Sequence, residues 1–189
     1  MTKFLLVFFI FLQLPLASLG AVFNFLHWDI KDGLSNNEVV DLAYDRHENL
    51  WIATEAGLNL FDGKSFILFD TSNSKIAGDA LNTLFYDQET DKLWIGTKSG
   101  VSIIDCDTRT FLSTEPLDTI QMDNNIMSFS KSKDGIWIAN RFGKIIHLNK
   151  RKNKVDVYSS QNVKDLPNGY LKVFDNHKGE VYLSLIHIS

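Results

Sequence analysis

Charged residues recur at a fixed interval in this sequence. Glu55, Lys98 and Arg141 stand 43 residues apart, each just before a glycine, and Phe142 directly follows Arg141. Carboxylate, ammonium and guanidinium groups hydrogen-bond hydroxyls and carboxylates, and an arginine beside an aromatic ring adds a stacking surface to a fork of donors. We therefore take these four residues as candidates for ligand contacts, with ordinary solvated loop residues as the competing interpretation.

Motifs for other chemistry are missing from the sequence. It contains no H-E-x-x-H, G-x-S-x-G, C-x-x-C or phosphate-binding glycine loop. Cys106 lies in the apolar stretch "VSIIDC", which is typical of a small core residue rather than a nucleophile. The histidines are scattered, and we interpret all of them as surface or turn residues: His27, His47, His147, His177 and His187. The sequence thus predicts no catalytic residue, no metal site and no cofactor.

The 43-residue interval extends to the residues around these candidates. Three tryptophans are each followed six residues later by a glycine, and a weaker fourth copy has a tyrosine: Trp51 with Gly57, Trp94 with Gly100, Trp137 with Gly143, and Tyr182. An interval of this length indicates an internal structural repeat. We expect the aromatic residue to supply contact area between repeats, and the glycine to let the chain turn sharply.

Each repeat reads as four short strands. In the first repeat the runs "NEVVDLAYD", "LWIAT", "LNLF" and "SFILFD" are rich in β-branched and aromatic residues and alternate with turn residues. Asp62-Gly63 predicts a two-residue hairpin turn between the third and fourth strands. A period of about 43 residues with four strands predicts an all-β fold of β-propeller blades, each a four-stranded antiparallel meander.

The repeats divide the chain into segments. Lys3, an unbroken apolar run of thirteen residues and small residues up to Gly20 predict a signal peptide and hence an extracytoplasmic, periplasmic location. The expected segments are 1–20 signal peptide, 21–35 lead-in or closing strand, 36–77, 78–121 and 122–165 blades one to three, and 166–189 a partial fourth blade. Closed propellers have about four to eight blades, so the sequence predicts an incomplete propeller. The ending "SLIHIS" resembles translated adapter DNA, and residues after about 183 are candidates for non-native sequence.

Charge and cysteine content exclude some classes of partner and stabilisation. The net charge of −4 argues against nucleic acid or an anionic membrane as the main partner. One cysteine cannot form an internal disulfide, so stability must come from packing. The two terminal blades would then expose apolar faces, and we expect the chain to associate with itself.

The stretch "DGLSNNEVVDLAYDRHENLWIATEAGLNLFDGKSF" resembles the two-component regulator propeller repeat, which fills the periplasmic sensor region of Bacteroidetes hybrid two-component systems. The resemblance extends from residue 28 to about 183. Ala53 and Ala139 depart from the repeat's glycine, which Gly96 keeps, and Tyr182 replaces the tryptophan.

This resemblance implies a pair of seven-bladed propellers followed by an immunoglobulin-like domain, one membrane helix, a histidine kinase and usually a response regulator. It also implies an oligosaccharide ligand, a homodimer and an inner-membrane anchor downstream. On this reading the fragment is a non-enzymatic sensor. The alternatives are a secreted carbohydrate-binding or scaffold propeller and, third, a propeller lyase or hydrolase.

Overall fold

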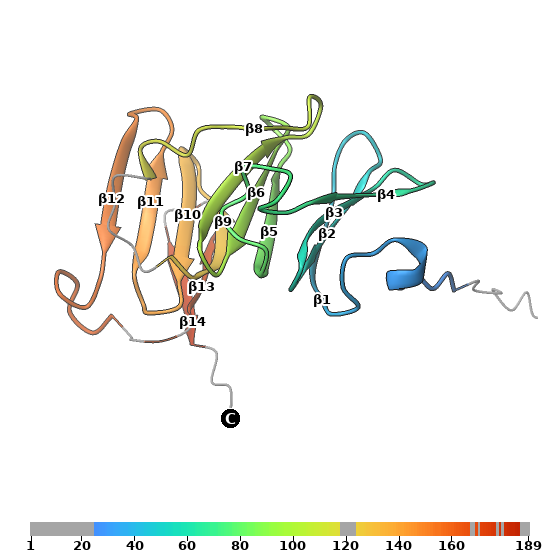
Figure 1. Cartoon of the computed structure of the whole chain (residues 1–189). Coiled ribbons are helices and arrows are strands. Elements are labelled where there is room, and N and C mark those ends of the chain that lie inside the picture. Colours follow the sequence, from blue (N-terminus) through green and yellow to red (C-terminus); the bar gives the residue numbers. More distant parts are fainter. Residues whose placement is uncertain are drawn as a thin grey trace, which may run out of the picture.

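The computed structural model describes residues 25–117, 124–166, 169, 171–176, 178 and 180–185. The predicted signal peptide and residues 186–189 lie outside this range. The described part is built from antiparallel strands, and its helical element is the short 3-10 helix η1 (Ile30–Asp32) (Figure 1). The described part of the predicted lead-in, 25–35, holds η1 and no strand. No helix within the described ranges is long and apolar enough to cross a bilayer.

Three four-stranded meanders and one strand pair follow each other along the chain. The first sheet is β1 (Val39–Tyr44), β2 (Leu50–Thr54), β3 (Gly57–Phe61) and β4 (Phe66–Phe69). The second is β5 (Leu81–Asp87), β6 (Lys92–Thr97), β7 (Gly100–Asp105) and β8 (Thr110–Phe111). The third is β9 (Ile126–Lys131), β10 (Gly135–Asn140), β11 (Ile145–Asn149) and β12 (Lys154–Tyr158). The pair is β13 (Leu171–Asp175) and β14 (Val181–Leu185).

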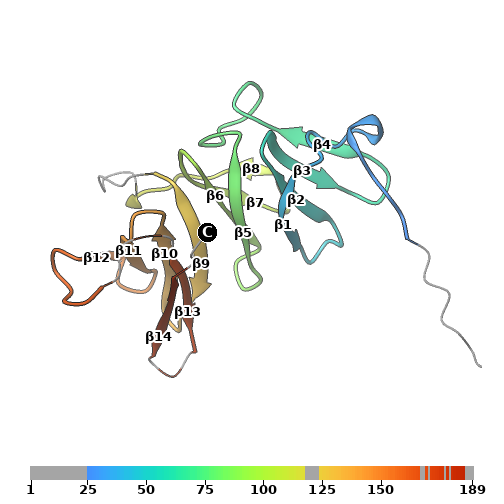
Figure 2. The same ribbon diagram turned by 90° about the horizontal axis from the view of Figure 1, so that it is seen from below.

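The sheets are arranged as an open fan whose first strands lie next to one another (Figure 2). Side chains of one first strand hydrogen-bond the next: Asp41 Oδ2 accepts the backbone N–H of Leu84 at 2.7 Å, and Ser128 Oγ accepts that of Val173 at 3.0 Å. The described strands do not close into a ring. The predicted class, propeller blades in an incomplete propeller, is confirmed.

The central strands are apolar on both faces because each sheet packs between neighbours. In β2, Trp51, Ile52, Ala53 and Thr54 are all buried. Trp51 is fully buried in a core shared with Leu81, Leu93 and Ile104 of the second sheet. Burying one such large side chain stabilises the fold by roughly 1.5–3 kcal/mol. We call the contacts between the first and second sheets, the second and third sheets, and the third sheet and the β13–β14 pair the first, second and third junctions.

Two predictions about turns have different outcomes. The repeat glycines lie at positive φ, with values of 116° at Gly57, 149° at Gly100 and 80° at Gly143, as a sharp turn requires. The predicted two-residue turn at Asp62-Gly63 is wrong, because Phe61 pairs with Phe66 and the loop therefore spans residues 62–65. The Asp62 carboxylate accepts the backbone N–H groups of Lys64 and Ser65, which fixes this wider loop.

The outer faces of the fan remain open to solvent. Tyr44 in β1 is 64% exposed, whereas its counterpart Tyr86 in β5 is half-buried against the first sheet. On the other outer face, Phe174 and Tyr182 are also more than half exposed. Apolar positions that are covered inside the fan are thus uncovered at both of its ends.

Candidate functional site

The predicted ligand residues lie on the turns between the second and third strands of each sheet. A polar side chain at the end of the second strand shapes each turn: Thr54 Oγ1 accepts the backbone N–H of Ala56, Thr97 Oγ1 that of Ser99, and Asn140 Oδ1 that of Phe142. The three turns therefore present Glu55, Lys98 and Arg141 from equivalent positions.

The structure brings Glu55 and Lys98 together. Lys98 Nζ lies 3.0 Å from Glu55 Oε1 and 2.7 Å from Oε2, so the pair joins the first and second sheets. Both side chains are partly exposed. Each charge is compensated by the other, and a ligand at this point would have to compete with the ion pair.

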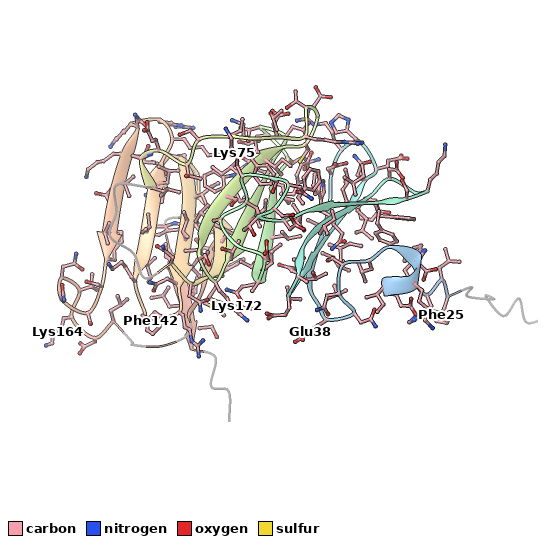
Figure 3. The ribbon with its side chains drawn as sticks, in the orientation of Figure 1. Phe25, Glu38, Lys75, Phe142, Lys164 and Lys172 are labelled. Carbon is pink, nitrogen blue, oxygen red and sulfur yellow. The ribbon has the colours of Figure 1, made fainter. Side chains whose placement is uncertain are left out.

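Arg141 and Phe142 belong to the turn of the third sheet. The backbone N–H of Arg141 donates to Asn125 O at 2.8 Å, which ties the turn to the segment before β9. Phe142 is more than half exposed at the edge of the molecule (Figure 3). It lines a pocket of about 270 Å³ with Asn140, Lys144 and residues 159–161. The aromatic ring is thus available for stacking.

A larger cleft of about 330 Å³ lies at the second junction, next to the turn that carries Lys98. Its polar groups come from Lys75, Ser99, Ser102, Thr114 and Asn124, and its apolar wall includes Phe111, Leu112, Ile126, Ile138 and Ile146. Figure 3 labels Lys75. The cleft is not evident from the sequence, because its walls come from three successive repeats.

Charged groups of neighbouring sheets meet at the opposite ends of the strands. At the first junction, His47 Nε2 lies 2.8 Å from Asp91 Oδ2, and Arg46 Nε lies 3.0 Å from Oδ1. Hydrogen bonding to Asp91 raises the pKa of His47. Burial would raise the pKa of Asp91, but hydrogen bonds from Tyr86, His47 and Arg46 outweigh it and hold that pKa below its ordinary value.

The second junction contains a buried carboxylate held by two lysines. Asp87 is 2% exposed, and its oxygens accept from Lys150 Nζ at 2.6 Å, Thr90 Oγ1 at 2.7 Å and Lys131 Nζ at 3.2 Å. Burial favours protonation, but the bonds from Lys150, Thr90 and Lys131 prevail and lower the pKa of Asp87 to about 2. This cluster is a structural tie between sheets.

Sequence interpretation of the histidines and of Cys106 has mixed outcomes. Cys106 is buried in the core of the first junction, and burial raises the pKa of its thiol to about 12, as expected of a core residue. His47 lies in the β1–β2 turn, as expected. The prediction is wrong for His147, whose side chain is 12% exposed in β11 and stacks on Trp137 with ring centroids 4.3 Å apart.

The surroundings of His147 superficially resemble a nucleophilic triad. Its Nε2 lies 2.9 Å from Ser132 Oγ and 3.5 Å from Asp134 Oδ1. In a working triad the acid holds one ring nitrogen and the nucleophile the other. Because both groups here share Nε2, the arrangement cannot orient the imidazole as a general base for Ser132.

Within the described ranges, no three histidine, cysteine or acidic side chains lie close enough together to hold a metal ion. What the geometry offers is a set of small polar and aromatic pockets along the edges of the sheets. Pockets of this composition are suited to binding a small ligand.

Comparison with known proteins places this geometry in context. Residues 33–56 match the family model of the two component regulator propeller. Histidine kinase P4 of Formosa agariphila is 36% identical over 66 residues, which are 35% of this chain and 5% of that protein. The resemblance predicted from the sequence is confirmed.

Solved structures agree with this match. One is the extracellular domain of a protein described as a hybrid two component system of B. thetaiotaomicron, which is 28% identical with a TM-score of 0.74 over 85% of this chain and 24% of that chain. A second such extracellular domain of the same organism is 16% identical with a TM-score of 0.66, over 81% of this chain and 20% of that one, and supports the fold alone. This chain therefore spans a quarter or less of these relatives.

Proposed function

We propose that this chain is the extracytoplasmic, ligand-sensing propeller segment of a hybrid two-component signalling protein, and that it detects glycan-derived oligosaccharides for a downstream histidine kinase. The observation that carries the proposal is the likeness to the extracellular domain of such a system, at 28% identity over 85% of this chain. The match of residues 33–56 to the regulator propeller repeat supports the same role.

The construction of the fan fits a sensor. Neighbouring sheets share an apolar core and are also joined by polar pairs near the strand ends, such as Glu55–Lys98 at one end and His47–Asp91 at the other. A ligand that binds better to one arrangement of two sheets than to another shifts the equilibrium between these arrangements. The segment needs no catalytic group for this role, because phosphoryl transfer belongs to the kinase.

Location and assembly follow from the same proposal. The predicted signal peptide directs the chain across the inner membrane, a helix downstream anchors it, and the full-length protein forms a homodimer. The solved relative that is 28% identical is itself an extracellular domain, which supports an extracytoplasmic position.

The proposal is tested on the full-length protein. The encoding gene is expressed with a reporter for its output, and cells receive single oligosaccharides released from plant or host glycans. We expect one glycan class to switch the reporter on and to raise the melting temperature of the purified extracytoplasmic region. A gene without a membrane helix and kinase, or a protein that no oligosaccharide affects, would overturn the proposal.

A further inference from the structure

The third junction departs from the repeat pattern at the residue that pairs with the tryptophan. Each repeat tryptophan lies on the second strand of its sheet and pairs with a residue on the third strand: Trp51 with Leu60, Trp94 with Ile103, and Trp137 with His147. Leu60 and Ile103 are buried apolar residues. His147 thus places an imidazole where the other two sheets have an aliphatic side chain.

Two further departures fall at the same junction. The tryptophan of each sheet also pairs with a residue on the first strand. Two positions further along the chain from that residue, the first and second sheets have Asp45 and Asp87, whereas the third has Ser132. Tyr86 of β5 and Lys131 of β9 occupy equivalent positions in the first strands of their sheets. Asp175 occupies this position in β13.

These substituted residues contact one another through Trp137. Ser132 Oγ lies 2.9 Å from His147 Nε2, the rings of His147 and Trp137 stack at 27°, and Trp137 Nε1 donates to Asp175 Oδ2 at 3.0 Å. Three departures from an internal repeat therefore form one connected polar and aromatic group.

A pocket of about 370 Å³ opens beside this group. At the first junction Tyr86 extends its hydroxyl to Asp91, 2.7 Å away, and at the second Lys131 reaches Asp87. The side chain of Asp175 is shorter than that of Tyr86 or Lys131, and this leaves the space of the pocket open at the third junction. The walls are formed by Ser132, Lys133, Asp134, Trp137, His147, Asp175, Lys178 and Val181.

We propose that this pocket binds one pyranose ring of a neutral oligosaccharide, a proposal that rests on the sensing function above. Small-molecule sites usually combine an aromatic or apolar wall with a few polar groups that point to the same spot. The volume of this pocket lies near the lower end of the roughly 300–1,000 Å³ that such sites occupy. Carboxylates of Asp134 and Asp175 accept from sugar hydroxyls, and the ammonium groups of Lys133 and Lys178 donate to them. With two cations and two anions around it, the pocket has no net charge that would select an acidic sugar.

The repeat itself supplies variants that should fold. His147→Leu and Asp175→Tyr introduce the residues that the first and second sheets carry at these positions. Lys64→Ala, in the exposed β3–β4 loop of the first sheet and away from the third junction, is the control. Binding to the full-length protein is followed by tryptophan fluorescence and saturation-transfer NMR with cellobiose, maltose, lactose and mannobiose, and the kinase reporter is read in parallel.

We expect one of these disaccharides to bind, the two pocket variants to lose at least tenfold in affinity with little change in melting temperature, and the control to bind as the parent does. If a disaccharide binds and switches the reporter equally well in both pocket variants, the pocket proposal is overturned while the sensing function stands. If the reporter answers to longer glycans but no disaccharide contacts the protein, the pocket proposal is likewise overturned. If no glycan acts at all, both proposals fail.

Discussion

Lys98 Nζ lies within 3.0 Å of both carboxylate oxygens of Glu55, so the turn of one sheet is bound to the turn of the next. The two residues are 43 positions apart in the chain and occupy the same place in successive repeats. Opposite charges at one repeat position thus become an ion pair between neighbours.

The free energy of this pair can be measured with a double-mutant cycle of Glu55→Ala and Lys98→Ala. Because the pair is partly exposed, we expect a coupling of roughly 0.2–1 kcal/mol that falls as salt is added. Urea unfolding at low and high ionic strength provides the measurement. The charge-reversed double variant, Glu55→Lys with Lys98→Glu, should recover most of the coupling, and no coupling at low salt would contradict the ion pair.

Replacing Asp87 should cost much more. Asp87→Asn removes a buried charge held by two lysines. Lys150 loses this partner while Lys131 keeps Glu89, and we expect a loss of about 2 kcal/mol or more. The folded pKa of about 2 lies below the ordinary value of 3.8, so this contribution is present above about pH 4 and is lost as pH falls toward 2. By linkage, this pH-dependent contribution of Asp87 to the free energy of unfolding is about 2 kcal/mol.

Unfolding curves between pH 2 and 6 test this prediction. The acid-induced loss of stability should be smaller in Asp87→Asn than in the parent. Glu89→Gln, which alters an exposed partner of Lys131, is the control and should change little. Equal acid sensitivity in Asp87→Asn and the parent would show that another group is responsible.

His47 should give stability the opposite dependence on pH. Its folded pKa is raised above 6.5, chiefly by the hydrogen bond to Asp91, so its contribution is present below pH 6.5 and is lost as pH rises through the folded value. We expect His47→Gln to flatten the decline in melting temperature between pH 6 and 8. NMR titration of the His47 ring in the folded chain, with an apparent pKa at or below 6.5, would contradict the assignment.

The repeat, the strand order within each sheet and the mainly apolar second strands were predictable from sequence, because Trp51, Trp94 and Trp137 mark the interval and apolar residues occupy both faces of their strands. The inter-sheet pairs were not, because the register between sheets is set by packing that no single repeat contains. Glu55 and Lys98 could be placed on one edge, but not in contact. The pattern that the repeats share does not indicate the burial of His147, because this residue replaces the aliphatic Leu60 and Ile103 of the other sheets and is covered by stacking on Trp137.

Glycine substitutions separate backbone conformation from close packing. Gly57 has φ of 116°, and an added Cβ would lie 2.7 Å from Leu68 Cδ1 and 3.0 Å from Phe69 O. Gly63 also has positive φ, but nothing lies within 4 Å of its Cβ position. We expect Gly63→Ala to cost about 1 kcal/mol and Gly57→Ala about 2–4 kcal/mol, measured by urea unfolding. Similar costs for the two would mean that the turn at Gly57 relaxes away from β4.

The exposed ends of the fan predict self-association. Leu42 and Tyr44 on β1 and Phe174 on β13 are large apolar residues at positions that neighbouring sheets cover elsewhere in the chain, and uncovered apolar patches of this kind favour association. Sedimentation of the chain over a range of concentrations should show an increasing mass. Tyr44→Lys and Phe174→Lys should reduce it, whereas Phe142→Lys, at a comparably exposed apolar residue on a turn, should not. A chain that stays monomeric at every concentration, or a Phe142→Lys effect equal to the other two, would show that the open faces are not the contact.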